Sequence, residues 1–243
     1  MKPMQYNEEE KNLIDRVHAV FPKVELDPEV AIGQIAFDEP KGIYFYGSCE
    51  AQDFEGLFRG VSFEEIVFLG EKDNSFFWPS KFKPLPWWEV PLNAMDNRAD
   101  FEDLFRMNPY AKFYYLPWLM QVQIHCIALF RAAKERLAGS AVADGNLLNS
   151  LVVPGTVVDE CWEAIHSLPQ EFRNPMNRFE HCHLDDRDEF LVFLSFFDEA
   201  QKIAVSQFVH YCLNYPLIFQ YEREYANENE MKRRLKSIWH FAG

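Results

Sequence analysis

A long apolar-rich stretch, Tyr110–Gly139, is the feature that most limits how this chain can fold. Its sequence, YAKFYYLPWLMQVQIHCIALFRAAKERLAG, is dense in large apolar side chains and ends in glycine, a common helix terminator. Lys134 and Arg136 lie in the last turn, where cations favour the negative end of a helix. The stretch predicts a long helix that starts near Pro109, and Pro117 either kinks this helix or marks its true first turn.

Other segments also repeat apolar residues at helical spacing. A first helix is predicted over Glu8–Phe21, where the acidic cluster Glu8–Glu10 suits the positive end of a helix. Ser195 followed by Asp198 forms a capping pattern for a late helix. The further helices predicted are Cys49–Phe58, a short one opening at Ser62, one near Val157–Leu168, one from Phe196 to about Asn214, and a last one ending in KRRLKSIW, with Ile238 and Trp239 turned inward.

The segments between these helices complete the predicted architecture. The aromatic run Gly42–Ser48 indicates a short strand. Residues 73–92 carry four prolines and three tryptophans, which predicts an ordered loop that packs on the core. We therefore expect a mainly α protein (α or α+β), an irregular helical domain with a few short strands and this long aromatic and proline-rich loop. Residues 1–243 form one domain in this interpretation, and the turn-rich segment 140–150 is the best place for a subdomain boundary.

The charge of the chain narrows the class of partner. It holds 38 acidic and 24 basic residues, a formal net charge of −14, and residues 1–105 hold 21 acidic against 10 basic side chains. Such a surplus repels phosphate backbones and attracts a basic protein, so direct nucleic-acid binding is disfavoured. No apolar run approaches the roughly 20 residues that span a bilayer. With a start that lacks a secretory pattern and five singly placed cysteines, the sequence predicts a cytoplasmic protein with no membrane partner.

The stretch Glu180–Asp188, EHCHLDDRD, concentrates potential metal ligands. A two-histidine, one-carboxylate site drawn from it uses His181, His183 and Asp185, with His210 or His240 as the remote ligand. In the interpretation that we favour, Asp185 is instead the N-cap of a helix that runs through EFLVFL, with Asp188 three residues later. We therefore predict no bound metal and no cofactor.

Two cysteine–histidine pairs raise the hypothesis of thiol catalysis, which needs a thiolate and a base close together in space. These pairs are Cys161 with His166 and the adjacent His125 and Cys126. The second pair lies in the long apolar segment, where cysteine is commonly a small buried hydrophobe. The sequence contains no GxSxG, HExxH, GxxxxGK[ST] or GxGxxG motif. We therefore assign no catalytic residue and favour a non-enzymatic function.

Three segments together resemble an uncharacterised bacterial family, a domain of unknown function. They are VHAVFPKVEL near the start, FYYLPWLMQVQI (Phe113–Ile124) in the middle and SFFDEAQKIAVSQFVHYCL (Ser195–Leu213) near the end. The family pattern has an amphipathic first helix, a Tyr-Leu-Pro segment that opens a helix, and a late helix with a glutamine before an apolar stripe. This chain is longer, and residues 73–92 and 140–150 look like insertions. The resemblance implies a mainly helical, bacterial, cytosolic protein and assigns no catalytic residue.

Three hypotheses of function follow. The leading one is a non-enzymatic protein-binding module, an immunity or antitoxin type of inhibitor that covers the active site of a basic partner. Its predicted contact residues are Glu50, Asp53, Glu55, Glu64, Glu65, Asp100, Glu102 and Asp103. The first alternative is a metal-dependent enzyme, a hydrolase or similar, that uses the cluster of His181, His183 and Asp185. The second is a mimic of nucleic-acid charge, which requires acids regularly spaced along an exposed face.

Overall fold

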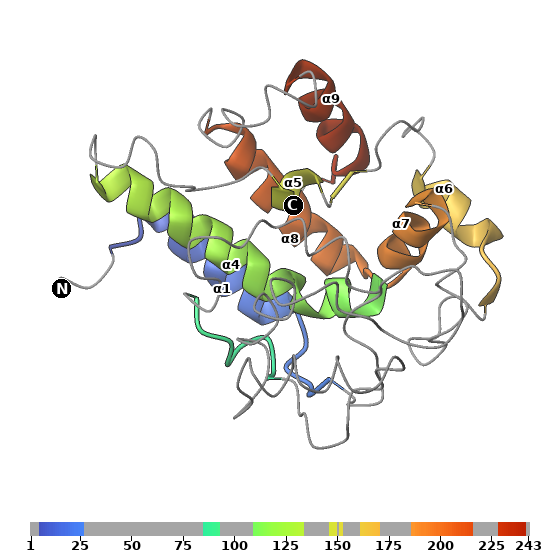
Figure 1. Ribbon diagram of the computed structural model, residues 1–243, viewed down its shortest axis with the longest axis horizontal. Coiled ribbons are helices and arrows are strands. Elements are labelled where there is room, and N and C mark those ends of the chain that lie inside the picture. Colours follow the sequence, from blue (N-terminus) through green and yellow to red (C-terminus); the bar gives the residue numbers. More distant parts are fainter. Residues whose placement is uncertain are drawn as a thin grey trace, which may run out of the picture.

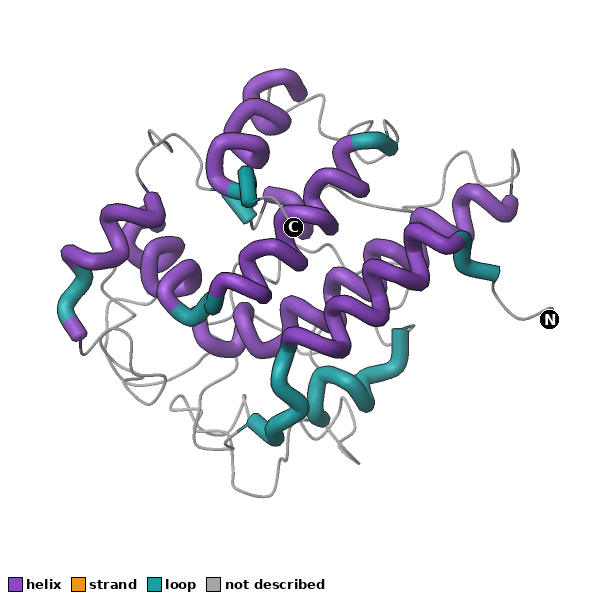
Figure 2. The backbone as a smooth tube through the Cα atoms, turned by 180° about the vertical axis from the view of Figure 1, so that it is seen from behind, coloured by secondary structure: helices purple, strands orange, loops and turns teal. Residues whose placement is uncertain are grey.

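The computed structural model shows a helical protein (Figure 1). It describes residues 5–26, 85–92, 109–133, 146–149, 151–152, 161–170, 186–215 and 228–241. Its helices are α1 (Glu8–Val20), α4 (Pro109–Ala133), α5 (Asn146–Asn149), α6 (Cys161–Ala164), the 3-10 helix η2 (Ile165–Ser167), α7 (Asp186–Ser195), α8 (Glu199–Leu213) and α9 (Glu228–Ile238). No strand occurs within these ranges, and the predicted mainly α class is confirmed (Figure 2). The predicted strand at 42–48, the helices predicted within 49–65 and the boundary at 140–150 lie outside the described residues.

Helix α1 begins with a capping box. The Asn7 side chain accepts a hydrogen bond from the Glu10 amide at 2.8 Å, and the Glu10 carboxylate accepts one from the Asn7 amide at 2.7 Å. These reciprocal bonds satisfy two amide groups, one of them among those that a helix start leaves unpaired. Leu13 and Val17 are buried on the inner face. The helix predicted over Glu8–Phe21 is therefore confirmed.

Helix α1 lies against α4 and runs antiparallel to it (Figure 1). Tyr6, just before α1, meets His125 in the second half of α4 through a 2.7 Å hydrogen bond. Leu26, beyond the end of α1, donates its amide to the Tyr114 hydroxyl near the start of α4 at 3.1 Å. The two contacts fix opposite ends of α1 on opposite ends of α4.

A buried carboxylate joins three helices near the start of α1. The Glu10 side chain is fully buried, and its Oε1 accepts a hydrogen bond from the Tyr211 hydroxyl of α8 at 2.9 Å. Its Oε2 lies 2.5 Å from Arg131 Nη2 of α4, in addition to the Asn7 amide. Arg131 also donates to the Gln5 carbonyl at 3.4 Å, and its side chain is 40% exposed. Pairing and hydrogen bonding of this kind are what allow a carboxylate to be buried.

Helix α8 also runs antiparallel to α1. Gln201, near the start of α8, donates its side-chain amide to the Val20 carbonyl at the end of α1 at 3.3 Å. Tyr211, near the end of α8, reaches Glu10 near the start of α1. Because α4 and α8 are both antiparallel to α1, they run in the same direction along the molecule.

Helix α4 contains a proline well inside its span. Proline has no backbone N–H, so the carbonyl one turn earlier loses its usual helical partner. The helix nevertheless continues through Pro117, and the Gln121 side chain donates to the Pro117 carbonyl at 3.2 Å. The predicted long helix is therefore confirmed over Pro109–Ala133, and Pro117 lies within it and not in its first turn. Residues 134–139 lie outside the described part of the chain.

Helix α8 begins later than the predicted start at Phe196. Its N-cap is Asp198, whose side chain accepts from the Gln201 amide at 2.8 Å, while the Gln201 side chain accepts from the Asp198 amide at 3.0 Å. Ser195 instead ends α7, and its hydroxyl donates to the Val192 carbonyl at 2.7 Å. The predicted cap at Ser195 is wrong because a capping box needs a long glutamate or glutamine at the third position, which only Asp198 has.

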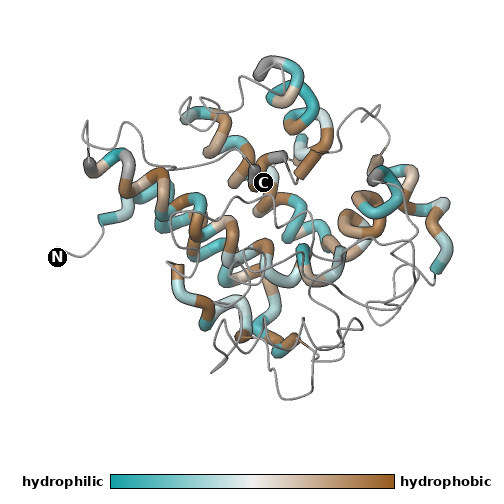
Figure 3. Tube along the Cα trace, viewed as in Figure 1, coloured by the Kyte–Doolittle hydropathy of each residue, from teal (hydrophilic) through white to brown (hydrophobic). Residues whose placement is uncertain are grey.

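The helices enclose a core with many aromatic side chains, and Figure 3 shows hydrophobic residues along α4, α7 and α8. Its largest side chains with almost no exposed surface are Trp87, Trp118, Tyr115, Tyr211, Phe193, Phe208 and Leu116. Trp87 belongs to the proline-rich loop and donates its indole N–H to the Pro22 carbonyl at 3.2 Å. The described part of that loop, residues 85–92, therefore packs on the core as predicted. Ile238 and Trp239 are buried, which confirms their predicted orientation.

Three tyrosines that are buried within the described part of the chain make the fold sensitive to alkaline pH. Burial raises the pKa of Tyr114 to about 12 and the pKa of Tyr115 well above its ordinary value. Burial, followed by the hydrogen bond to Glu10, also raises the pKa of Tyr211. A tyrosine in the unfolded chain titrates near pH 10. The stabilisation from these neutral hydroxyls is therefore complete below about pH 10 and is lost above it, at up to about 1.4 kcal/mol per pH unit for each tyrosine.

Urea unfolding between about pH 9 and pH 11 measures this dependence. The Tyr114→Phe variant keeps the buried ring but removes the hydroxyl that donates to the Val24 carbonyl at 2.9 Å. We expect its free energy of unfolding to fall less steeply with pH than that of the parent protein, because the contribution of Tyr114 is gone. Equal slopes for the two proteins would contradict the assignment.

Candidate functional site

A groove lies between α1, α8 and residues 236–241, which comprise the end of α9 and the segment after it. Its volume is about 1330 Å³. Small-molecule pockets typically measure ~300–1,000 Å³, so this groove is larger than a single small ligand needs. Its three walls come from parts of the chain that are far apart in the sequence: residues 9–20, 206–213 and 236–241.

The groove has an apolar floor and a polar rim. The large apolar side chains lining it are buried or half-buried: Leu13, Val20, Val209, Leu213, Trp239 and Phe241. Exposed polar side chains line its edges: Glu9, Asn12, Asp15 and Arg16 on α1, His210 on α8, and Lys236 and His240 on the third wall. An apolar centre surrounded by a polar rim is the usual anatomy of a protein–protein interface.

The charges of the two outer walls differ in sign. The α1 wall carries Glu9 and Asp15 against Arg16, a net negative wall, whereas the third wall carries Lys236. The charged side chains of the groove are Glu9, Asp15, Arg16 and Lys236, two acidic and two basic. The groove itself is therefore formally balanced in charge, and the surplus that gives the chain its net charge of −14 belongs to other residues.

Hydrogen bonds from tryptophan side chains to backbone carbonyls hold the third wall in place. The indole N–H of Trp162, in α6, donates to the Ile238 carbonyl at 2.8 Å. The indole N–H of Trp239 donates to the Leu151 carbonyl at 3.0 Å, and the Trp239 ring packs edge-on against Trp162, with centroids 5.5 Å apart. This wall is therefore fixed through contacts with α6, α8 and the turn after α5.

The predicted metal cluster is only partly placed by the structure. His181, His183 and Asp185 lie outside the described residues, and α7 begins at Asp186, directly after the predicted N-cap. The proposed remote ligands His210 and His240 are both exposed, and both line the groove. Within the described ranges, no group of three or more histidine, cysteine or acidic side chains is placed to hold a metal ion.

The predicted acidic contact surface is likewise untested by the geometry. All eight of its members, Glu50, Asp53, Glu55, Glu64, Glu65, Asp100, Glu102 and Asp103, lie outside the described residues. The charge that they contribute still belongs to the chain, whatever their arrangement. The contact surface thus remains a prediction.

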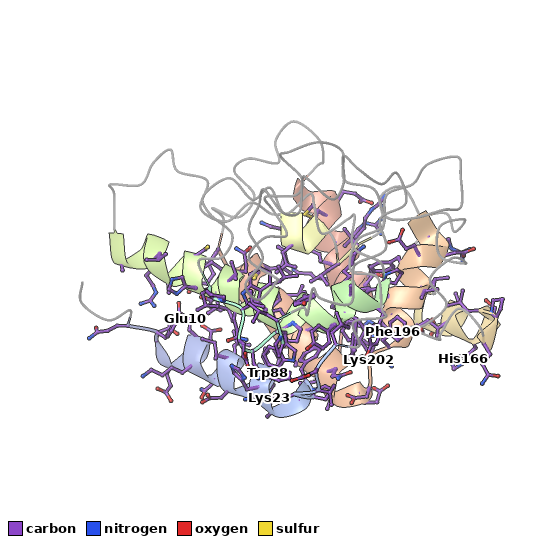
Figure 4. The ribbon with its side chains drawn as sticks, turned by 60° about the horizontal axis from the view of Figure 1, so that its bottom comes forward. Glu10, Lys23, Trp88, His166, Phe196 and Lys202 are labelled. Carbon is purple, nitrogen blue, oxygen red and sulfur yellow. The ribbon has the colours of Figure 1, made fainter. Side chains whose placement is uncertain are left out.

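The cysteine–histidine pairs lie in environments that oppose thiolate chemistry. Cys161 is buried, whereas His166 is exposed and lies at the outer edge of the molecule in Figure 4. Burial raises the pKa of the Cys126 thiol and lowers the pKa of the neighbouring His125. His125 Nδ1 is already engaged by the Tyr6 hydroxyl. The raised pKa of the Cys126 thiol disfavours its reactive thiolate, so the pair of His125 and Cys126 carries no catalytic assignment.

The groove residues on α1 were not predicted from the sequence. The polar residues Glu9, Asn12 and Arg16 follow one another at spacings of three and four, a pattern that predicts an ordinary solvent-exposed helix face. Only the position of residues 236–241 across the groove makes that face a groove wall. No local pattern reports such a contact, because it joins the two ends of the chain.

The chain was compared with protein-family models, curated proteins and solved structures, and none of them matches it. The resemblance to an uncharacterised bacterial family therefore remains a prediction. Among the described helices, none combines the length and the apolar character needed to cross a membrane.

Proposed function

We propose that this chain is a non-enzymatic protein-binding module, of immunity or antitoxin type, whose partner is a basic protein. The observation that carries the proposal is the groove between α1, α8 and residues 236–241, with its apolar floor and polar rim. Its volume and its mixed lining suit a polypeptide segment better than a compact small ligand.

The apolar floor supplies the surface that a partner segment would cover. Leu213 and Phe241 are half-buried in the chain alone, so each still has apolar surface to lose on binding. Removing such surface from water is favourable by about 25 cal/mol per Å² before the costs of association are counted. The polar rim, with Glu9 and Lys236 on opposite walls, then favours one orientation of the segment over the other.

The net charge of −14 supports a basic partner. Long-range attraction raises the rate of encounter, and it weakens as salt screens the charges. In this proposal the eight predicted acidic residues between Glu50 and Asp103 steer the partner, and the groove receives part of it. Covering the active site of a basic enzyme is how an inhibitor of this type would act.

A capture experiment with a matched pair of variants tests the proposal. Ala19 is an exposed alanine that lines the groove, and Ala132 is an exposed alanine on α4 that is not among the groove residues. Replacing either by arginine keeps good helix propensity, but only Ala19→Arg places a long charged side chain in the groove. We expect the parent and Ala132→Arg to capture the same basic protein from host lysate, near one to one, and Ala19→Arg to bind it at least about tenfold more weakly, a change of about 1.4 kcal/mol.

The capture is run at low and at moderate salt, with bound proteins identified by mass spectrometry. Retention of nothing at either salt would remove the proposal, and metal analysis of the parent and His183→Ala proteins would then test the alternative of a metal-dependent enzyme. Equal retention by Ala19→Arg and Ala132→Arg would keep a protein-binding role but remove the groove from it.

A further inference from the structure

The third wall of the groove ends in a short segment outside any helix. Helix α9 ends at Ile238, and residues 239–241 continue across the side of α8. The Ser206 hydroxyl of α8 lies within hydrogen-bond distance of two of their carbonyls, those of Trp239 at 3.0 Å and Phe241 at 2.8 Å. A hydroxyl has a single hydrogen to donate, so the two carbonyls share one donor. Trp239 is buried and has its own indole bond, but Phe241 depends on other contacts.

The side chain of Lys202 supplies such a contact. Its ammonium nitrogen lies 4.5 Å from the centroid of the Trp162 ring and 5.5 Å from the centroid of the Phe241 ring. The two rings are nearly perpendicular, at 85°, with centroids 5.2 Å apart, so they form two sides of a box around the cation. Glu199 closes the box from α8 itself, with Oε1 2.6 Å from Nζ. In Figure 4, Lys202 is labelled well apart from Glu10.

We propose that Lys202 is a latch that holds Phe241, and with it the outer part of the third wall, in the position that shapes the groove. Lys202 is not itself a groove residue, whereas His240 and Phe241 are. The Lys202 side chain is only 16% exposed, so water screens its attraction to the rings weakly. Lys202 therefore acts as a positioning residue: with the cation in place the wall is closed, and without it the segment after Trp239 detaches from α8.

Backbone ¹⁵N relaxation of the full chain tests the latch without any partner. In the parent protein we expect the Phe241 N–H to show an order parameter near ~0.85, the value of rigid backbone, and in Lys202→Met a value below ~0.6, typical of a flexible segment. Lys202→Arg should retain the rigid value, because arginine also stacks on aromatic rings. Lys11→Met removes an exposed lysine of α1 that is not a groove residue, and it should behave like the parent.

The order parameters of α8 serve as the check that Lys202→Met still folds. A rigid Phe241 in Lys202→Met, or a flexible one already in the parent protein, would overturn the latch. Should Lys202→Met fail to fold, Phe241→Leu replaces it, because this variant removes one ring of the box. The ammonium of Lys202 lies over that ring, so we expect the signal of the adjacent ε-methylene protons to shift downfield in the NMR spectrum of the variant. Unchanged ε-methylene shifts in that variant would count against the latch equally.

The link from the latch to binding rests on the proposed function. If a partner occupies the groove, only the closed wall presents the full site, so loss of the latch should weaken binding roughly 2- to 30-fold, the range of a cation–π contact. Failure to capture any partner would remove the proposed function, while the relaxation experiment would still decide the latch. A captured partner that binds parent and Lys202→Met equally, although Phe241 has become flexible, would overturn the link alone.

Discussion

The Arg131→Met variant is expected to lose about 3–5 kcal/mol of stability at neutral pH, because the fully buried Glu10 carboxylate loses the cation that pairs with it. The Tyr211 hydroxyl at 2.9 Å and the Asn7 amide at 2.7 Å remain as donors, but neither carries a charge. Methionine covers much of the same apolar surface as the arginine stem, so the loss reports on charge more than on packing. Urea unfolding at constant salt measures the difference.

A double variant separates this cause from a general loss of packing. Without Arg131, the Glu10 carboxylate is buried with no countercharge, which is unfavourable. The double variant with Glu10→Gln removes that uncompensated charge, so it should be more stable than Arg131→Met alone. The absence of any gain from Glu10→Gln would show that the ion pair is not responsible.

The Trp239→Ala variant is expected to cost about 3–5 kcal/mol, the range for removing a buried tryptophan from a core. The ring is 3% exposed and packs edge-on against Trp162 and Phe197, with centroids 5.5 Å away in both cases. Its loss also leaves the Leu151 carbonyl without the indole donor at 3.0 Å. A cavity and an unsatisfied buried carbonyl then act together.

The Trp239→Phe variant separates these two contributions. Phenylalanine retains much of the ring but has no N–H, so its cost should stay near the ~1–3 kcal/mol of an unsatisfied buried acceptor together with a smaller cavity. Thermal and urea unfolding of both variants measure the costs. If alanine were no more costly than phenylalanine at this position, the ring would contribute little and the packing argument would fail.

Helix positions followed from local sequence because their determinants are local. Leu13 and Val17 lie one turn apart and are buried together, as the apolar spacing predicts. The start of α8 was misplaced because two residues, Ser195 and Asp198, each had a local reason to cap it. The reach of Gln201 back to the Asp198 amide decides between them. The sequence contained that information, since a glutamine three residues after an aspartate is itself a capping signal.

The burial of Glu10 could also be predicted in part from the sequence. The cluster Glu8–Glu10 was interpreted only as an acidic start that suits the helix dipole, and Glu8 and Glu9 are indeed exposed. Glu10, however, precedes Leu13 by three residues and Val17 by seven, which places it on the buried face. The partners that make this burial tolerable, Arg131 and Tyr211, lie more than 100 residues away and have no local signature.

The groove and the latch could not be predicted for the same reason. Each depends on residues 236–241 returning to α8 and lying beside α1, an arrangement set by the packing of the whole core. The Lys202 side chain is at an ordinary helix position in the sequence, and only its meeting with Trp162 and Phe241 gives it a role. Aromatic composition predicted a dense core but not which ring would face a cation.

The antiparallel packing of α1 against α8 has a consequence for synthesis on the ribosome. Helix α1 emerges before α8, and the hydroxyl that completes the Glu10 site belongs to Tyr211, 201 residues later. Until α8 has left the exit tunnel, the apolar face around Leu13 and Val17 lacks one of its two neighbours. Contacts this distant in sequence form slowly, and exposed apolar faces of partly made chains attract other chains. Helix α1 is therefore secured only after α8 has been made.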